Sequence, residues 1–511
     1  MSKVESAGAL ILPPILAISA SLFMTLVFLV ATGMTNTWIA LILLGLMTGT
    51  GVFWAADIKR VLLYVFVFTA SIDINKALIV EGGVLAPGLS LTVADVFFFP
   101  LVLVWLWDKK VIRKERIDYG DVRWPMWLFL GWMWLTAILS LERFGGILAA
   151  ITYSKYFLTT VVLADIIRDV KTLRGVLCVF AAGLVLQILM VSAQFVTRSH
   201  LEIQGAKATE LGTKLVFEQA GGLHVFRPSG FLHHPNVLAD YLTFLLPTML
   251  LFLLQGPQRI GKTTWTAAGV LFVGGMGAMV VSLSRGGWIA FGAAVVFLLY
   301  MGFRKRLVRQ DQIVFFAAVA FLGGIVTIVA FPAAYYRITQ SDQRSAESRW
   351  AMTEQALLII RRNPVFGVGL GGYNRAAQQN IPPSFSNISE YFQQKLLEGI
   401  VHNRYLLTAS EHGIPGIVFL FLLVGSFIVA YLRVPRWADP SYCLLGLGLA
   451  SSLVAQLVFY AFDHFYTDIR ILLCWVAFGI LAALLKINKK SLEKLDREAA
   501  LAKSPTGNSP T

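Results

Sequence analysis

The sequence predicts an all-α polytopic membrane protein with about 12–14 transmembrane helices. Of its 511 residues, 57% are hydrophobic and only 14% are charged, with a mean hydropathy of +0.70. A soluble domain carries about 25% charged residues. Runs of roughly 20 apolar residues, each long enough to cross about 30 Å of hydrocarbon, recur along the whole chain. We therefore expect the lipid bilayer to surround the protein, and we expect no nucleic-acid partner despite the net charge of +14.

The apolar runs define fourteen candidate spans. The first follows Lys3 without a small-residue cleavage site, so we expect a retained helix rather than a removed signal peptide. The cysteines (Cys178, Cys443 and Cys474) lie inside spans without metal-ligand spacing, which indicates neither disulfides nor zinc. The expected spans lie near residues 8–32, 37–55, 60–72, 88–107, 124–140, 147–165, 174–197, 236–255, 264–283, 286–303, 311–332, 405–432, 440–460 and 470–486.

The positive charges predict the orientation of these spans. More than half of the 43 lysines and arginines fall in the connections on one side, including residues 108–116, 304–309 and the tail after residue 486. The positive-inside rule makes this side cytoplasmic. The two long connections, 198–235 and 331–403, then lie outside. All seven histidines also lie at the outer side, although the greater length of the outer loops alone accounts for any one of them: His200, His224, His233, His234, His402, His412 and His464.

One short connection has the spacing of a nucleotide-binding loop. Gly256, Gly261, Lys262 and Thr263 form G-x-x-x-x-G-K-T, which cradles phosphates in nucleotide hydrolases. That loop requires a preceding strand and a domain that holds the nucleotide. Here the motif fills a turn between two spans, so we interpret Lys262 as a charge that orients the membrane helices, and the sequence argues against an ATPase.

The second long connection has internal order. An amphipathic helix is predicted at 344–362, on the outer leaflet or over a cavity, with an apolar side formed by Ala346, Trp350, Leu357 and Ile360. Asn363–Pro364 ends this helix, because the residue before proline avoids helical angles. The glycine-rich segment 366–374 (FGVGLGGYN) then predicts a tight loop, which fits either phosphate binding or a plain turn.

Three stretches place arginine or histidine at the outer boundary of a span: 226–241 (FRPSGFLHHPNVLADY), 283–291 (LSRGGWIAF) and 401–416 (VHNRYLLTASEHGIPG). A single arginine at such a place can simply extend to the lipid headgroups. Three such places, two of them with histidine, favour an anion site, because guanidinium groups bind phosphate oxygens bidentately. Histidine adds a group that can transfer protons near neutral pH.

Two charges lie inside apolar spans. Lys155 (ITYSKYFLTT) and Asp95 (TVADVFFF) each occupy a position where a charge costs at least about 2.5 kcal/mol on insertion scales. We predict that they pair with each other as a structural contact. A role in the anion site is the alternative.

Taken in this order, the stretches resemble the O-antigen ligase and polymerase superfamily of bacterial membrane glycosyltransferases. No single motif is specific, but the ordered set is fairly specific and covers roughly residues 220–435. The motifs are R-x-S-G…H-P-N at 227–236, S-R-G-G at 284–287, an arginine-containing helix with N-P-x-x-G-x-G at 349–369, H-N-x-Y-L at 402–406 and E-x-G-x-x-G at 411–416.

The resemblance implies a GT-C-type fold with a large periplasmic loop containing amphipathic helices. It implies transfer of a glycan from undecaprenyl diphosphate, with inversion and with no metal or other cofactor, to lipid A core, another lipid-linked glycan or a protein serine. The active site would face the periplasm from the bacterial inner membrane, with other polysaccharide-assembly membrane proteins as further partners. The sequence agrees, because it has no D-x-D pair for a metal-bridged sugar nucleotide.

Within this resemblance we expect His402 to act as the general base that removes the proton of the acceptor hydroxyl. Arg227 and Arg285 would bind the diphosphate and stabilise the charge that grows on it. Arg349 and Arg404 are further candidates for the same anion.

Two assignments leave alternatives open. Glu411 orients the histidine or the loop, or it is an ordinary surface charge. His233, His234 and Asn236 line the path of the acceptor, or they only start the following helix.

The expected organisation has four parts: N-terminal transmembrane helices (1–219), a ligase- or polymerase-like catalytic region (220–435) with periplasmic loop 333–403, C-terminal transmembrane helices (436–488) and a disordered cytoplasmic tail (489–511). The alternative function is a polytopic transporter or flippase of polysaccharide precursors, although the chain lacks the related halves common in transporters. Between polymerase and ligase, the HHPN element (233–236) looks more like the polymerases.

Overall fold

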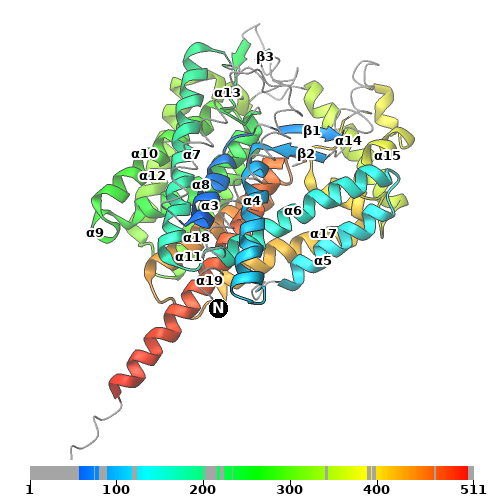
Figure 1. The fold of residues 1–511 in the computed structure, drawn as a ribbon. Coiled ribbons are helices and arrows are strands. Elements are labelled where there is room, and N and C mark those ends of the chain that lie inside the picture. The colour runs from blue at the N-terminus through cyan, green and yellow to red at the C-terminus, as the bar shows by residue number, and fades with distance from the viewer. Residues whose placement is uncertain are drawn as a thin grey trace, which may run out of the picture.

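The computed structural model confirms an all-α polytopic membrane protein, a bundle of long helices (Figure 1). It describes residues 57–73, 75–79, 89–117, 123–199, 201, 216–218, 224–232, 234–339, 343–387, 393, 397, 399–464 and 468–503. Within these residues, nine helices are long and apolar enough to cross a membrane. They are α6 (Arg143–Ile166), α7 (Val170–Thr197), α8 (Pro235–Gln255), α10 (Lys262–Val281), α11 (Arg285–Arg304), α12 (Gln310–Ala330), α17 (Arg404–Leu432), α18 (Pro440–Phe459) and α19 (Asp468–Lys503).

Three shorter helices also correspond to expected spans: α3 (Ile58–Thr69), α4 (Val93–Trp107) and α5 (Arg123–Ile138). Together these helices match the last twelve of the fourteen expected spans, and the first two spans lie outside the described residues. The remaining α-helices are α9 (Pro257–Ile260), α13 (Pro332–Thr339), α14 (Gln343–Arg362) and α15 (Tyr373–Gln379), and short π and 3-10 helices occupy Asp108–Ile112 and Pro383–Asn387. Two short antiparallel pairs join β1 (Asn75–Ile79) to β2 (Leu89–Thr92) and β3 (Val216–Glu218) to β4 (His224–Phe226).

Helices α8, α18 and α19 form the centre of the bundle. Over their most apolar windows, α8 and α19 are each 83% buried and α18 is 78% buried, whereas α12 is 0% buried. All three central helices contribute to one large apolar core. Polar side chains carried by these helices therefore lie where water is scarce.

The motif stretches at 226–241, 283–291 and 401–416 all lead into helix N-termini. His234 caps α8, Ser284 caps α11 and Asn403 caps α17, each by accepting a hydrogen bond from a backbone N–H of the first turn. Such caps satisfy N–H groups that have no partner inside the helix. Contacts of Arg227 with Ser282 and Asn236, and of Asp463 with Asn236 and His402, bring these three stretches together at one end of the bundle, which we call the motif-bearing end.

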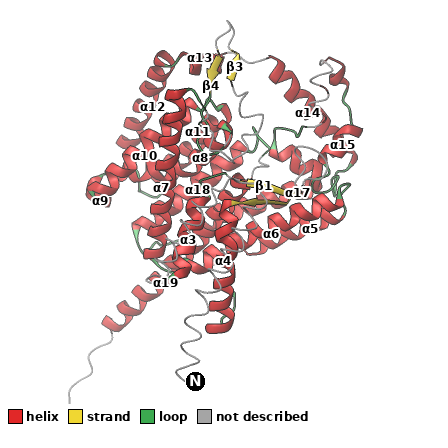
Figure 2. Cartoon of the chain, turned by 45° about the horizontal axis from the view of Figure 1, so that its top comes forward, coloured by secondary structure: helices red, strands yellow, loops and turns green. Residues whose placement is uncertain are grey.

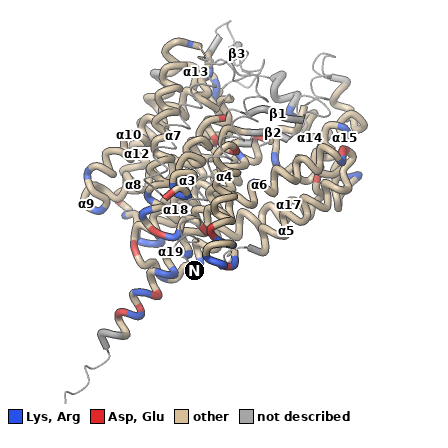
Figure 3. Tube along the Cα trace, in the orientation of Figure 1, with Lys and Arg blue, Asp and Glu red and all other residues tan. Residues whose placement is uncertain are grey.

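The two ends of the bundle differ in character. Lysine and arginine gather at the end that carries α9 and the extension of α19 (Figure 3). The opposite end carries β3, α13, α14 and α15 (Figures 1 and 2). This separation is the pattern that the positive-inside rule predicts when the end with α9 is cytoplasmic.

The nucleotide-loop motif forms a plain turn, as the sequence predicts. Helix α8 ends at Gln255, α9 occupies Pro257–Ile260 and α10 begins at Lys262, which is exposed. Residues 234–281 are described without a gap and contain no strand.

Helix α14 forms as expected. Trp350 and Leu357 are 66% and 40% exposed, because the helix packs against α15 and α17 through a different side, Ala351, Met352, Ala356 and Ile359. One sequence prediction needs correction. We expected a disordered tail from residue 489, and this prediction is wrong for residues 489–503, because α19 continues to Lys503. Good helix formers and pairs such as Lys494–Glu498 extend it.

The predicted contact between Lys155 and Asp95 is confirmed. Lys155 Nζ donates to Asp95 Oδ2 at 3.0 Å, and both side chains are largely buried between α4 and α6. The same carboxylate completes a capping box with Thr92 at the start of α4. The pair thus fixes the start of one helix against the side of another.

We predict that Lys155→Met alone lowers the free energy of unfolding by about 3–5 kcal/mol, because it leaves a buried carboxylate without its partner cation. The double variant Asp95→Asn/Lys155→Met should recover most of this loss. Thermal unfolding in detergent measures the difference. Additive losses in the double variant would show that the two residues do not act as a pair.

Candidate functional site

Arg227 joins the starts of two helices at the motif-bearing end. Its side chain is buried, its Nε donates to the carbonyl of Ser282 at 2.7 Å, and its Nη2 donates to Asn236 Oδ1 at 3.2 Å. Ser282 lies in the turn between α10 and α11, and Asn236 lies in the first turn of α8. Arg227 is therefore fixed before any ligand arrives.

The charges of three other arginines affect the pKa of Arg227. Burial, and after it the charges of Arg337, Arg285 and Arg349, together lower the pKa of Arg227 to about 9. Arg337 is held by the carbonyl of Leu283, to which its Nε donates at 3.2 Å. We call Arg227, Arg285, Arg337 and Arg349 the arginine cluster. A bound anion would relieve the repulsion among these four cations.

A buried carboxylate lies beside this cluster. Asp463, in the turn between α18 and α19, accepts from Arg470 Nη1 at 2.9 Å and from Asn236 Nδ2 at 3.3 Å. Its burial opposes ionisation, but interactions with Arg470, His464 and His402 outweigh burial and hold the pKa of Asp463 well below its usual range. Because Asn236 contacts both Arg227 and Asp463, one amide links the arginine cluster to the carboxylate.

His402 faces this carboxylate from the start of α17. Its Nδ1 lies 3.7 Å from Asp463 Oδ1, and its side chain is 41% exposed. The backbone N–H of Arg404 donates to the carbonyl of Tyr460 at 2.7 Å, and Asn403 Nδ2 donates to the carbonyl of Ala461 at 3.1 Å. These bonds fasten the segment that carries His402 to the turn that carries Asp463.

The imidazole of His464 lies near the same oxygen of Asp463. His464 Nε2 lies 3.7 Å from Asp463 Oδ1, and the two histidine rings are 5.1 Å apart between centroids. Burial lowers the pKa of His464 to about 4, so this imidazole is neutral at physiological pH.

The polar network continues into the centre of the bundle. Arg470 Nε lies 3.8 Å from Asp240 Oδ2, and Gln456 Nε2 donates to Asp240 Oδ1. These residues come from α19, α8 and α18. The carboxylate of Asp463 is thus held by side chains from the most buried helices of the protein.

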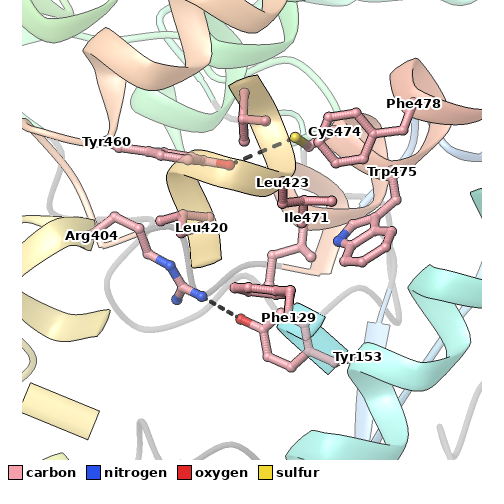
Figure 4. A pocket seen from close by; sticks show the side chains of 11 residues that line it. Phe129, Tyr153, Arg404, Leu420, Leu423, Tyr460, Ile471, Cys474, Trp475 and Phe478 are labelled. Atoms are coloured by element: carbon pink, nitrogen blue, oxygen red, sulfur yellow. Dashed lines mark hydrogen bonds between the residues drawn. The ribbon is translucent and has the colours of Figure 1, made fainter. Parts of the chain in front are cut away.

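Arg404 lies against a small cavity rather than among the arginine cluster (Figure 4). Its Nη2 donates to the hydroxyl of Tyr153 at 2.6 Å, and its charge acts on His464. The cavity measures about 30 Å³ and has aromatic walls that include Phe129, Trp475 and Phe478. Each water needs roughly 10–15 Å³ of such space, so the cavity has room for about two waters.

Glu411 holds the glycine-rich loop. It is buried, which excludes an ordinary surface charge, and its Oε1 accepts from the N–H of Gly371 at 3.1 Å. The N–H of Gly369 donates to its carbonyl at 3.0 Å. Of the two active roles that the sequence allowed, these contacts favour orientation of the loop over orientation of His402.

The contact between this loop and α17 depends on a kink at Gly413. Its φ is +68°, and a Cβ there would lie 2.0 Å from the carbonyl oxygen of Val365. The N–H of Ile414 donates to the carbonyl of Pro364 at 2.8 Å. The kink therefore lets the chain after α14 pack directly onto α17.

Within the HHPN element, His234 caps the following helix, whereas Asn236 contacts Arg227 and Asp463. His234 Nδ1 accepts from the N–H of Asn236 as the cap of α8, and burial lowers its pKa to about 3. Pro235 follows at the first helical position, where proline is favoured. His233 lies outside the described residues.

Sequence reasoning missed four residues of this network: Arg337, Asp240, Asp463 and Arg470. Asp240 and Arg470 carried a usable signal, because each is a charge inside an apolar span, the same signal that identified Lys155. Asp463 lies in a short turn with no motif. Its importance appears only when the starts of α8, α17 and α19 come together.

Comparison with known proteins agrees with the motifs. Residues 268–421 match the model of the family described as O-antigen ligase. This match covers less than a third of the chain, and it confirms the resemblance of that region to the O-antigen ligase and polymerase superfamily. The matched region includes Arg285, Arg337, Arg349 and His402, whereas Arg227 and Asp463 lie on either side of it.

A Haemophilus influenzae protein described as "Uncharacterized protein" is 23% identical to the chain over 184 residues. The aligned part covers 33% of this chain and 44% of that protein, so the chain spans less than half of that relative's length.

We predict that Gly413→Ala strongly destabilises the protein, because alanine would have to adopt a left-handed conformation and collide with Val365. Such strain alone costs about 1–3 kcal/mol. Gly425→Ala in the same helix is the matched control, since nothing lies within 4 Å of a Cβ there. Equal melting temperatures for the two variants in detergent would contradict the role of the kink.

Proposed function

We propose that the protein is a membrane glycosyltransferase that transfers a glycan from an undecaprenyl-diphosphate-linked donor to an acceptor hydroxyl. The reaction would take place at the periplasmic face of the bacterial inner membrane, with inversion at the anomeric carbon and without a metal. The similarity of residues 268–421 to the O-antigen ligase family supports this class of function.

One observation carries the proposal. The arginine cluster and His402 share the motif-bearing end of the bundle, and Asn236 and Asp463 connect them. A cluster of guanidinium groups suits a diphosphate leaving group, and an exposed imidazole beside a carboxylate suits proton removal. Both requirements of the transfer are therefore met within one network.

The proposed step follows from this arrangement. Asp463 faces Nδ1 of His402, which leaves Nε2 to accept the proton of the acceptor hydroxyl. The acceptor oxygen forms a bond to the anomeric carbon as the bond from that carbon to the diphosphate oxygen breaks. The bonding pair leaves with the diphosphate, whose growing charge the arginine cluster stabilises by preorganised electrostatics.

We propose a polymerase rather than a ligase, so that the acceptor is a second lipid-linked glycan instead of lipid A core. The support is the HHPN element at 233–236. A deletion strain tests the choice: single repeats that remain attached at the surface support polymerisation, and loss of all attached glycan contradicts it. Neighbouring polysaccharide-assembly membrane proteins are proposed as partners.

We predict that His402→Ala lowers kcat for transfer from a purified lipid-linked donor by about 10²- to 10⁴-fold, the usual contribution of a general base. The KM for the donor should change little, because His402 does not belong to the arginine cluster. A variant that keeps wild-type kcat would refute the assignment of the base.

We also predict that Arg285→Gln raises the donor KM and lowers kcat, since it removes one cation from the arginine cluster. Arg375→Gln is the matched control, because Arg375 is half exposed and pairs with Glu142 away from the cluster. Binding of inorganic pyrophosphate to the purified protein gives a readout free of catalysis. Equal pyrophosphate affinity for both variants would argue against a diphosphate site at this cluster.

A further inference from the structure

His402, Asp463 and His464 form a compact group of potential metal ligands. A ring nitrogen of each histidine and a carboxylate oxygen of Asp463 all lie within 4.8 Å of one another. Asp463 Oδ1 is 3.7 Å from Nδ1 of His402 and 3.7 Å from Nε2 of His464. We call this group the His–Asp–His triad.

These distances are close to those of an occupied metal site. In a tetrahedral zinc site with bonds of about 2.0–2.2 Å, neighbouring ligand atoms lie about 3.4 Å apart. The two edges that meet at Asp463 therefore need to shorten by only a few tenths of an ångström. Two imidazole nitrogens and one carboxylate oxygen are also the ligand types that zinc and related transition metals accept.

The two oxygens of Asp463 have separate partners. Oδ2 accepts from Arg470 and Asn236. Oδ1 faces the two imidazoles and also accepts from the backbone N–H of His464. Metal-binding carboxylates are commonly held by such outer hydrogen bonds, which fix their orientation. The exposed side of His402 gives an ion access from solution.

We propose that the His–Asp–His triad binds one divalent transition metal of the zinc class and that the bound ion blocks glycan transfer. A metal on Nδ1 of His402 leaves the ring proton on Nε2, so that the imidazole has no lone pair for the acceptor hydroxyl. The ion is an inhibitor and takes no part in the transfer. The inhibitory half of the proposal rests on the proposed role of His402, but the binding half does not.

Cobalt absorption tests the binding. Full-length protein, purified with a tag that lacks histidine, is titrated with Co²⁺, and its visible d–d bands are recorded. We expect one Co²⁺ per chain, competition by Zn²⁺ and no competition by Mg²⁺, which prefers oxygen ligands. His464→Asn should weaken binding more than about tenfold. Glu142→Gln, an exposed carboxylate outside the triad, should leave it unchanged.

The absence of saturable Co²⁺ binding, or equal affinity in wild type and His464→Asn, would overturn the site whatever the transfer activity. The second arm adds Zn²⁺ to the transfer assay. We expect inhibition that a chelator reverses, with more than about tenfold higher Zn²⁺ required for His464→Asn. Full transfer by wild-type protein with its metal site saturated would overturn the inhibitory half alone. Loss of transfer in metal-free wild-type protein would instead count against the proposed function.

Discussion

The ion pair between Asp463 and Arg470 is the contact on which the candidate site depends. Both side chains are almost fully buried, so neither charge is stabilised by bulk water. An isolated buried charge is costly, and breaking a buried pair by removing one partner commonly costs about 3–5 kcal/mol. Because Arg470 keeps the carboxylate of Asp463 charged, this carboxylate can also accept a hydrogen bond from Asn236 and face the imidazole of His402. One residue in a short turn thus orients side chains from three different helix starts.

This arrangement separates the chemistry from the membrane-spanning body. Helices α8, α18 and α19 form a buried apolar centre. Their polar side chains hold Arg470, the ion-pair partner of Asp463, through Asp240 and Gln456. The arginines that would meet a ligand lie at the motif-bearing end of this centre: Arg227 in the loop before α8, Arg285 at the first position of α11, Arg337 in α13 and Arg349 in α14. The kink at Gly413 and the contacts of Glu411 then fasten the glycine-rich loop onto α17. Support and chemistry are provided by different parts of the chain.

The sequence predicted features that a single segment determines. Span positions follow from hydropathy, and the Lys155–Asp95 contact follows from the cost of a charge in an apolar helix. It could not predict which side of α14 packs inward, because Trp350 is as apolar as the buried residues and membrane proteins expose apolar side chains to lipid. The helical extension of α19 was missed because its charged composition also fits a disordered tail.

The candidate site shows the same limit. Arginine and histidine at helix starts identified Arg227, Arg285 and His402, because each lies in a recognisable stretch. Arg404 shares such a stretch, yet its side chain turns toward Tyr153 and a cavity of about 30 Å³. Asp463 and Arg337 had no motif of their own. Their roles come from the approach of segments distant in the sequence, which local patterns do not encode.

The most direct test of the account is the effect of Asp463→Asn on kcat and on pyrophosphate affinity, measured on folded protein in detergent. If this carboxylate positions His402, kcat for glycan transfer should fall at least about 100-fold while pyrophosphate still binds the arginine cluster. Transfer at the wild-type rate by the folded variant would contradict the claim that a buried carboxylate organises the site.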